Sequence, residues 1–442
     1  TVSTVDELLA AINTANTRDD QNTRFRIFIK KGTYTIPLSS TMKTCNGYEV
    51  PECITFISGN NISFIGEDRD ATIITNAIPA DATFAGQYGT TSKYDGIGNS
   101  DVFQISSSAS GLYWQDLTVS TGMEDARGRD IAIQDKGTKN IYKNVCLHGY
   151  QDTWTSNNDN GLYFFDGGII RGRTDYICGK GDIYFKEVEF QQIAGGYCAV
   201  PSKPAKVGWV MKDCVINGDG DGVDGNYTLG RPWGQGTPVA VWIDTKMNVV
   251  PSGIGWNEMS GGWPARFAEY NSMTSSGSQI DLSGRKKIFA DTHENNPILT
   301  AEEAAEYSDM SKMYGDWQPT LATEQAPAVT NVKFEDGILS WTGNEYSLLY
   351  VVSKNGDAVA STTDTQFDTN TLNSNAAANR SGDTDVWTVR AANEMGGLSE
   401  AVAVGEGTGI ESVQMAEPVR MDGNIYNLAG QRVNKATRGL YI

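Results

Sequence analysis

Two aspartates in the middle of the chain have the residue type and spacing that suggest catalysis. Asp152 lies in residues 149–154 (GYQDTW), and Asp175 follows 23 residues later in residues 172–179 (GRTDYICG). If 23 residues form one coil of a stacked structure, both carboxylates lie on one face, about 4.8 Å apart. Such neighbours cannot both ionise cheaply, so one pKa rises and the other falls, which separates an acid from a nucleophile. The pair predicts paired-carboxylate catalysis, and the capping of turns is the structural alternative.

Two further residues could serve this pair. Arg231, in residues 229–233 (LGRPW), follows Asp175 by 56 residues, or two to two and a half coils, and its cation would decide which carboxylate stays charged. Gln151 adjoins Asp152, and its amide N–H could donate a hydrogen bond to an oxyanion. The serine-esterase motif GxSxG does not occur. Only two histidines offer a triad base, and we expect His148 to have a packing role.

A repeat of short β-rich segments would position these residues. In each of five segments, apolar or aromatic residues precede a polar position, and alternating apolar residues follow it. A period in the low to middle twenties, with Gly, Asn and Asp between the strands, predicts a parallel β-helix. A leucine-rich repeat would need a leucine-and-asparagine signature that is missing, and a β-sandwich with accidental spacing is the other alternative. The polar positions are 116, 144, 166, 187 and 213, and residues 62–66 give an earlier match.

Both ends of such a solenoid need covers. Residues 3–16 form an amphipathic pattern, which predicts a helix with Ser3 or Thr4 as its N-cap. Residues 300–314 predict a second helix, in which Thr300 and Glu303 form a capping box. We therefore expect an all-β solenoid with helical caps.

The residue composition and pattern of the sequence change after residue 318. Residues 319–328 read as a linker, and residues 329–404 show short alternating strands typical of a fibronectin type III-like β-sandwich. Residues 405–442 resemble the C-terminal sorting or anchoring modules of secreted bacterial enzymes, and a final β-hairpin of the sandwich is the alternative. The predicted domains are thus 1–318, 329–404 and the tail 405–442.

Net charge and hydropathy restrict the classes of molecule that the protein can bind. The net charge of −19 leaves no surplus of Lys and Arg to neutralise phosphates, which argues against nucleic acid as a partner. It also disfavours a strongly anionic polymer, whereas an esterified and less charged polymer is compatible. No run of 18 apolar residues is present, so we expect no membrane-spanning segment. The chain begins at Thr1 without a charged-then-apolar leader, and we expect a secreted protein, either extracellular or at the cell surface or in the periplasm, from which a signal peptide has been removed.

The cysteines and acidic loops give no strong metal signal. None of the six cysteines forms a CxxC pair, so we expect no zinc site. Cys45 with Cys53, and Cys198 with Cys214, are possible disulfides if the compartment is oxidising, and free buried thiols are the alternative. Residues 218–225 (GDGDGVDG) resemble a calcium loop with ligands at Asp219, Asp221 and Asp224, but a flexible Asp-Gly turn is favoured because the full EF-hand spacing is missing.

Three blocks resemble the signature motifs of the pectin methylesterase family. They are GYQDTW at 149–154, DYICG at 175–179 and LGRPW at 229–233, and they occur in the family's order. The resemblance extends over residues 1–318, from GTY at 32–34 to DWQP at 316–319. It implies a right-handed parallel β-helix, no metal or other cofactor, and a monomeric secreted esterase whose partner is methyl-esterified homogalacturonan (pectin).

The resemblance also implies roles for individual residues. Asp175 matches the nucleophile and Asp152 the general acid/base of the family. Gln151 matches the oxyanion-hole amide, and Arg231 matches the residue that holds the nucleophile. Trp233 matches an aromatic side chain that stacks on sugar rings.

Several positions depart from the family's pattern. Arg129 aligns with a second family glutamine, and Cys178 stands where the family often has a phenylalanine near the substrate. Trp154 begins a pair that replaces a family Leu-Tyr pair. We therefore expect altered pocket walls, with Arg129, Trp154 and Tyr176 joining Trp233 as substrate-binding residues.

Two other classes of function stay open at this point. One is another β-helix enzyme acting on the same polymer, a pectate lyase or a polygalacturonase-like glycosidase. The other is a non-catalytic solenoid that binds pectin. The reaction product separates them, because an esterase releases methanol, a lyase forms unsaturated sugars and a glycosidase forms new reducing ends.

Overall fold

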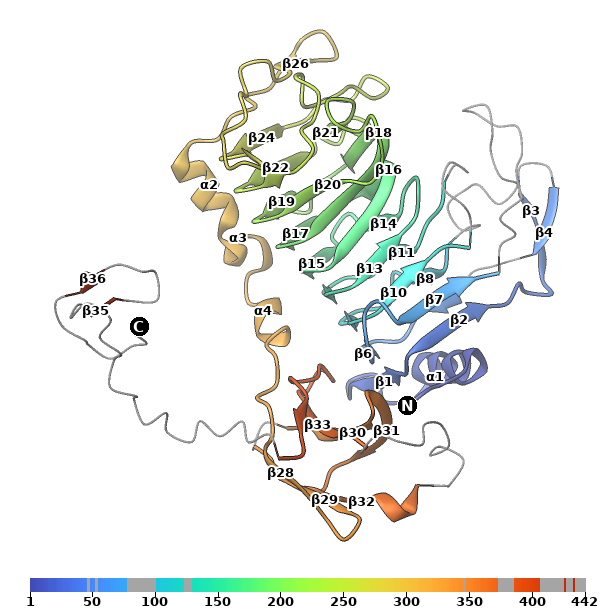
Figure 1. Cartoon of the computed structure of the whole chain (residues 1–442). Helices are drawn as coiled ribbons and strands as arrows, with labels where there is room; N and C mark the ends of the chain where they lie inside the picture. The colour runs from blue at the N-terminus through green and yellow to red at the C-terminus, as the bar shows by residue number, and fades with distance from the viewer. Residues whose placement is uncertain are drawn as a thin grey trace. The chain divides into compact units, whose positions relative to one another are not determined.

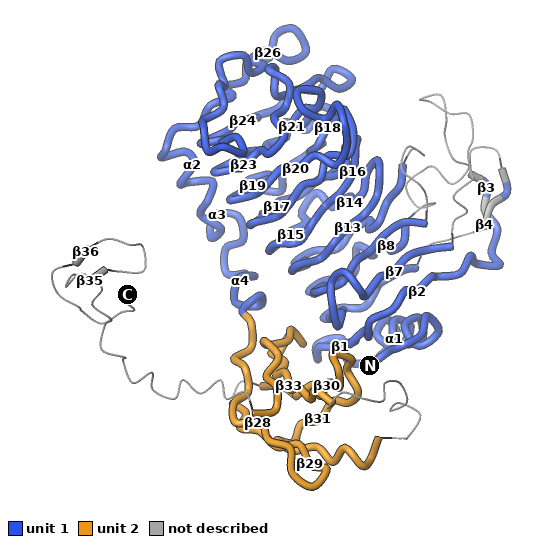
Figure 2. The backbone as a smooth tube through the Cα atoms, viewed as in Figure 1, with its two compact units in different colours: residues 1–324 blue, residues 325–442 orange. Residues whose placement is uncertain are grey.

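The computed structural model describes two compact units, residues 1–324 and residues 325–442 (Figure 2). Within the described residues, no helix is both long and apolar enough to cross a membrane. The description omits residues 46–47, 52–54, 78–100, 123–128, 345–346, 373–384, 406–424, 427–431 and 434–442.

The larger unit is built around a nine-stranded parallel sheet that receives one strand from each coil (Figure 1). Neighbouring strands in this sheet are separated in sequence by the rest of a coil, as in β1 and β6, where Phe25 aligns with Ile62. In order, the strands are β1 (Phe25–Ile29), β6 (Ile62–Gly66), β9 (Tyr113–Gln115), β12 (Asn140–Lys143), β15 (Leu162–Asp166), β17 (Asp182–Lys186), β19 (Trp209–Lys212), β22 (Val239–Ile243) and β24 (Arg266–Tyr270).

A fourteen-stranded sheet supplies the other two faces of the coils. Two long strands, β16 (Ile169–Gly179) and β18 (Glu189–Pro201), belong to two parallel rows at once. The first row contains β2 (Gly32–Ile36), β7 (Thr72–Asn76), β10 (Thr118–Ser120), β13 (Cys146–His148), β20 (Val215–Gly218), β23 (Lys246–Met247) and β25 (Met273–Thr274). The second, which we call the β14 row, contains β5 (Thr55–Ile57), β8 (Phe103–Ile105), β11 (Ile133–Asp135), β14 (Trp154–Ser156) and β21 (Thr228–Gly230). The predicted parallel β-helix is confirmed.

The polar repeat positions mark the corner that follows the nine-stranded sheet. Asp116, Asn144, Glu187 and Asp213 have φ of 53°, 47°, 56° and 55°, in the left-handed region that Asp and Asn tolerate better than most residues. After Asp166 the corner uses Gly167 and Gly168 instead, with φ of 66° and 85°. Each coil therefore turns where the repeat places a polar residue or glycine.

Aromatic side chains at equivalent positions of successive coils form a column inside the unit. The rings of Phe64 and Trp114 lie 4.1 Å apart, and those of Tyr142 and Phe165 lie 4.5 Å apart. Phe185 extends the column at 4.9 Å from Phe165. All five side chains are fully buried, so burial of large rings stabilises the stack of coils.

Helices cover this unit as predicted, with one correction. Helix α1 (Val5–Thr17) has Thr4 as its N-cap, which confirms the expected start of the helix. Residues 300–314 form two helices, α2 (Ala301–Ser308) and α3 (Met310–Tyr314), because Asp309 is extended and caps α3 by accepting a hydrogen bond from Ser311 N at 3.0 Å. The capping box of α2 is present.

Helix α3 lies against the nine-stranded sheet (Figure 1). The Tyr314 hydroxyl donates to the carbonyl of Tyr163 and accepts from the backbone N–H of Tyr184 at 3.0 Å. The predicted linker 319–328 contains a short helix. Its first residues form helix α4 (Pro319–Ala322), in which Pro319 is buried, and Ala326 belongs to the core of the smaller unit.

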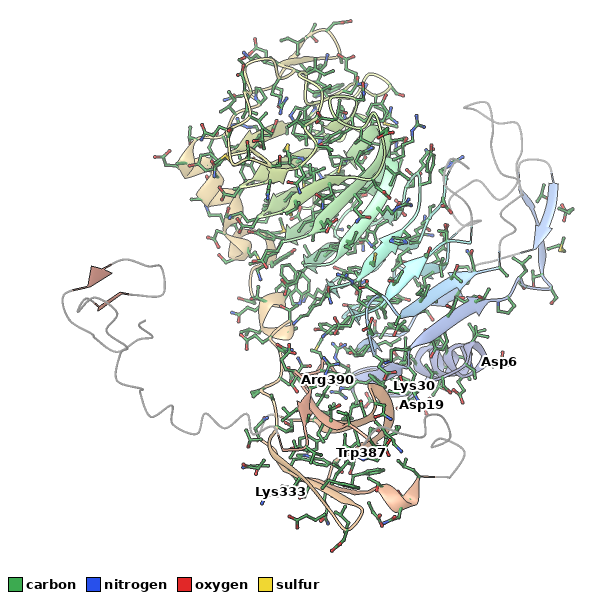
Figure 3. All side chains as sticks on the ribbon, viewed as in Figure 1. Asp6, Asp19, Lys30, Lys333, Trp387 and Arg390 are labelled. Atoms are coloured by element: carbon green, nitrogen blue, oxygen red, sulfur yellow. The ribbon has the colours of Figure 1, made fainter. Side chains whose placement is uncertain are left out.

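The smaller unit is a β-sandwich. A three-stranded and a four-stranded antiparallel sheet share one core that contains Leu339 and Trp341 from the first and Val352 and Trp387 from the second. Trp387, labelled in Figure 3, lies 5.9 Å from the Phe334 ring. The first sheet is β28 (Thr330–Glu335), β29 (Ile338–Thr342) and β32 (Gln366–Asp368), and the second is β31 (Asp357–Thr362), β30 (Leu349–Lys354), β33 (Trp387–Ala392) and β34 (Val402–Ala403).

The remaining elements are short. An antiparallel pair forms from β35 (Ile425–Tyr426) and β36 (Arg432–Val433), and most of the predicted tail 405–442 lies outside the described residues. The other elements are β3 (Met42–Cys45), β4 (Tyr48–Pro51), β26 (Ile288–Phe289), β27 (His293–Glu294) and the 3-10 helix η1 (Thr369–Thr371).

The described thiols are free and buried, so the possible Cys198–Cys214 disulfide is wrong. Both thiols belong to the interior core, and the Cys214 thiol lies 3.5 Å from the carbonyl oxygen of Phe185 and 3.4 Å from that of Lys212. The other possible pair falls on Cys53 and on the side chain of Cys45, which are outside the described part of the chain.

Candidate active site

Backbone register places the two predicted catalytic aspartates side by side. Gln151 forms parallel bridges with Arg129 in the preceding coil and with Thr174 in the following coil. The backbone N–H of Asp152 donates to the carbonyl of Thr174 at 3.2 Å. The next position of each coil carries Asp152 and Asp175, so the two residues are neighbours at the interstrand spacing of about 4.8 Å.

Both aspartates have an unusual backbone conformation. Their φ angles are 60° for Asp152 and 52° for Asp175, in the left-handed region. The corner residues Asp116, Asn144 and Asp213 adopt the same conformation, so the backbone turns at both aspartates. The side chains are almost fully buried, with 7% of Asp152 and 3% of Asp175 exposed.

Arg231 holds Asp175 through both carboxylate oxygens. Nε donates to Oδ1 at 3.0 Å and Nη2 donates to Oδ2 at 2.6 Å, which is the paired geometry of a strong charge-assisted contact. The backbone N–H of Arg231 donates to the carbonyl of Ala199 at 3.0 Å, which fixes the residue directly after β21. The guanidinium carbon also lies 3.8 Å from the centre of the Tyr197 ring.

Burial and nearby charges shift the pKa values of Asp175 and Cys178 in this site. Burial raises the pKa of Asp175, and the hydrogen bonds and positive charge of Arg231 oppose that rise. Burial also raises the pKa of the Cys178 thiol well above its usual value. The negative charges of Asp152 and Asp175 raise it further, whereas Arg231 and Arg129 lower it. Cys178 therefore lies within electrostatic range of both aspartates and both arginines.

Three other predicted residues are half-buried at this face. Arg129 and Gln151 are bridged neighbours, and Trp233 follows Arg231 with its backbone N–H bonded to the carbonyl of Pro201 at 2.9 Å. Among the described residues, the side-chain amide of Gln151 makes no hydrogen bond. Its N–H groups can therefore serve an incoming oxygen atom.

The expectation that Trp154 and Tyr176 bind substrate is corrected, because neither side chain has any exposed surface. Trp154 aligns with Ile177 of the next coil, and both point into the interior. Its ring meets those of Tyr163 and Phe165 edge-on, each at 5.2 Å. Tyr176, which precedes Ile177 in β16, also belongs to the interior core.

Sequence reasoning missed Tyr197 and its contact with Arg231. A signal was present, because Gln151, Thr174 and Tyr197 follow one another at intervals of 23 residues. Tyr197 aligns with Thr174 in the parallel register, which places it in the same row as Gln151. Extending the 23-residue period by one coil would have included it.

Two weaker candidates lie elsewhere. Nε2 of His148 lies 3.1 Å from Cys146 Sγ in the first row, in keeping with a packing role. In the acidic loop, Asp219 accepts from Arg171 at 3.3 Å and Asp224 accepts from the backbone N–H of Val250 at 2.7 Å. Within the described residues, no three His, Cys, Asp or Glu side chains are grouped to hold a metal ion.

Comparisons with known proteins identify the family. The pectinesterase family model matches residues 1–316. Pectinesterase A of Dickeya dadantii (strain 3937) is 28% identical over 355 residues, covering 68% of this chain and 85% of the relative. The pectinesterase of Aspergillus aculeatus is 26% identical over 232 residues, covering 49% of this chain and 67% of the relative.

Solved structures of pectin methylesterases share the fold. The enzyme PemA from Erwinia chrysanthemi has a TM-score of 0.52 at 24% identity, covering 70% of this chain and 93% of that structure. The carrot enzyme has a TM-score of 0.55 at 19% identity, covering 73% of this chain and 96% of that structure. The family match over residues 1–316 and the shared parallel β-helix lead to one conclusion: the chain belongs to the pectinesterase family of carboxylic ester hydrolases.

Proposed function

We propose that the chain is a pectin methylesterase that hydrolyses galacturonate methyl esters of methyl-esterified homogalacturonan to free carboxylate and methanol. The observation that carries the proposal is the Asp152–Asp175 pair, in which one member is held by Arg231 through both oxygens. Asp175 is thereby suited to be an ionised nucleophile, and Asp152 is suited to hold the proton.

The first half of the reaction forms an acyl-enzyme. An Oδ atom of Asp175 attacks the ester carbonyl carbon, and the carbonyl π electrons move to oxygen. The side-chain amide of Gln151 donates a hydrogen bond to this oxyanion, and Arg129, its bridged neighbour, offers a positive charge nearby. The C–O bond to the methoxy group then breaks, and protonated Asp152 gives its proton to the departing methanol oxygen.

The second half of the reaction restores the enzyme. Asp152, now ionised, takes a proton from water, and the resulting hydroxide attacks the acyl carbon. The bond to Asp175 breaks, which frees the galacturonate carboxylate. Arg231 stays paired with Asp175 throughout, so it stabilises the carboxylate both as nucleophile and as leaving group. No step requires a metal or another cofactor.

Substrate contacts involve the half-buried residues of the site. Trp233 is partly exposed beside Arg231 and offers a ring face to a sugar. Trp154 and Tyr176, which lie inside, act by supporting the strands that carry Asp152 and Asp175.

The test is methanol release from highly methylated pectin. The folded Asp175→Asn and Asp152→Asn proteins should each release none above background, whereas Asp281→Asn, at an exposed aspartate, should match the wild type. Near-wild-type activity in Asp175→Asn would refute the mechanism. Unsaturated products absorbing in the ultraviolet would indicate a lyase, new reducing ends a glycosidase, and binding without a product a non-catalytic solenoid.

The remaining assignments are part of the same proposal. The smaller unit is a fibronectin type III-like module, supported by its three-plus-four arrangement of antiparallel strands. Residues 1–318 form the esterase domain, and residues 405–442 form a sorting or anchoring tail. The protein is secreted and acts as a monomer on its polymer substrate.

A further inference from the structure

The Arg231–Asp175 contact spans more than one coil. Arg231 directly follows β21, and Asp175 lies in β16, with β18 between them in the sheet. Ala199 of β18 aligns with Gly230, so Arg231 begins two strand spacings, about 9.6 Å, from the coil of Asp175. The arginine side chain therefore reaches back across the intervening coil.

Tyr197 belongs to that intervening coil. Its neighbours in register are Thr174 on the side of Asp175 and Thr228 on the side of Arg231. The guanidinium carbon lies 3.8 Å from the centre of the half-buried Tyr197 ring, well inside the range for an attractive cation–π contact. The guanidinium thus contacts the ring while its N–H groups bond to the carboxylate.

A long arginine side chain needs such support. Its four-bond stem has many rotamers, and ordering it costs conformational entropy. Only a guanidinium held in the plane of the carboxylate makes both hydrogen bonds. The aromatic face restricts the group without competing for its N–H donors, because the ring interacts with the charge and not with the hydrogens.

We propose that Tyr197 is a positioning residue, whose ring holds the Arg231 guanidinium in the orientation that makes both hydrogen bonds to Asp175. This inference rests on the proposed esterase function and names a residue that acts through Arg231 without touching the reacting atoms. The required feature is the aromatic face and not the hydroxyl, so phenylalanine should replace tyrosine and an aliphatic residue should not.

The first experiment compares Tyr197→Phe with Tyr197→Leu in the full chain, measuring methanol release from methylated pectin as a function of pH. Tyr197→Phe should keep the wild-type kcat and pH profile. Tyr197→Leu should lose about tenfold in kcat with KM within about twofold. Its acid limb should move to higher pH, because weaker pairing with Arg231 leaves Asp175 protonated to a higher pH. If Tyr197→Leu does not fold, Tyr197→Met supplies the non-aromatic comparison.

A matched control is available in the coil of Asp152. The guanidinium carbon of Arg173 lies 5.8 Å from the centre of the Tyr150 ring, which gives a second arginine–tyrosine contact. Arg173 donates to the carbonyl of Gly195 and not to a carboxylate of the site. Tyr150→Leu should therefore leave the acid limb of the pH profile in place. An equal shift in Tyr150→Leu would show a general disturbance of this face and overturn the proposal.

A double-mutant cycle tests whether Tyr197 acts through Arg231. In an Arg231→Ala background, Tyr197→Leu should cause no further loss of kcat, because the group that the ring positions is absent. Additive losses would overturn the proposal, as would wild-type kinetics in Tyr197→Leu alone. If the wild type itself releases no methanol, the proposed function fails instead, so the two failures are distinguishable.

Discussion

Arg231 and Asp175 are joined by two hydrogen bonds across an intervening coil, at 3.0 and 2.6 Å. This contact makes the two aspartates of the site unequal. Asp152 and Asp175 occupy equivalent positions in adjacent coils and share the same left-handed backbone conformation. The different chemical roles that we propose for them therefore depend on a residue that approaches from two coils away.

The pH dependence of kcat/KM should reflect Asp175. Burial raises its pKa, so the acid limb should lie above the ordinary aspartate value of about 3.9. Activity should fall as the pH drops through that limb, because the protonated carboxyl is not a nucleophile. In Arg231→Lys the paired contact is lost, the pKa of Asp175 rises further and the limb should move to higher pH. An unchanged limb in Arg231→Lys would contradict this account.

Trp154 and Trp233 should respond differently to the same substitution. Trp154 is fully buried, so Trp154→Phe should lower the free energy of unfolding by about 1–3 kcal/mol and leave KM within about twofold. Trp233 is partly exposed, so Trp233→Phe should raise KM with little change in stability. Denaturant unfolding and Michaelis–Menten kinetics on both variants check this. A raised KM in Trp154→Phe would restore its original assignment to the substrate.

Cys178 should be unreactive despite its place in the site. Burial and the charges of Asp152 and Asp175 raise its pKa, and the thiolate is the form that alkylating reagents attack. At pH 8 iodoacetamide should label Cys178 far more slowly in the folded protein than in guanidinium chloride. Peptide mapping by mass spectrometry measures both rates. Equal labelling in the two states would mean that the thiol is accessible and ionised.

Asp135 should make stability depend on pH. It is fully buried, and burial raises its pKa to about 6, although Tyr142, Asn140 and Gly137 donate hydrogen bonds to it. The folded pKa lies above the unfolded value of about 3.9, so its contribution is fully present below pH 4 and is lost as pH rises through 6. Two pKa units correspond to about 3 kcal/mol.

The comparison with Asp135→Asn isolates this effect. Urea unfolding at pH 4 and at pH 7.5 should show the wild type losing about 3 kcal/mol relative to the variant over that range. The variant lacks the titrating group, so its other ionisable residues provide the matched background. A difference that stays constant with pH would mean that Asp135 titrates at an ordinary value.

The sequence by itself determined the coil architecture and which residues we propose as the catalytic set. A period near 23 residues reports how much chain forms one coil, so it predicted that Asp152 and Asp175 would be neighbours. The polar repeat positions gave the period, and in the structure they lie at the corners, where short polar side chains tolerate the left-handed conformation. Helix starts at Thr4 and Thr300 followed from local capping, which depends on three or four adjacent residues.

Only the tertiary structure decided which way the side chains face. Trp154 and Tyr176 lie close in sequence to the proposed catalytic residues yet belong to the core, and strict strand alternation does not predict this because Tyr176 and Ile177 are both inside. The contact of Tyr197 with Arg231 likewise depends on the register between coils. Local sequence determines which residues are neighbours along the chain, whereas these outcomes depend on which residues of adjacent coils lie beside one another.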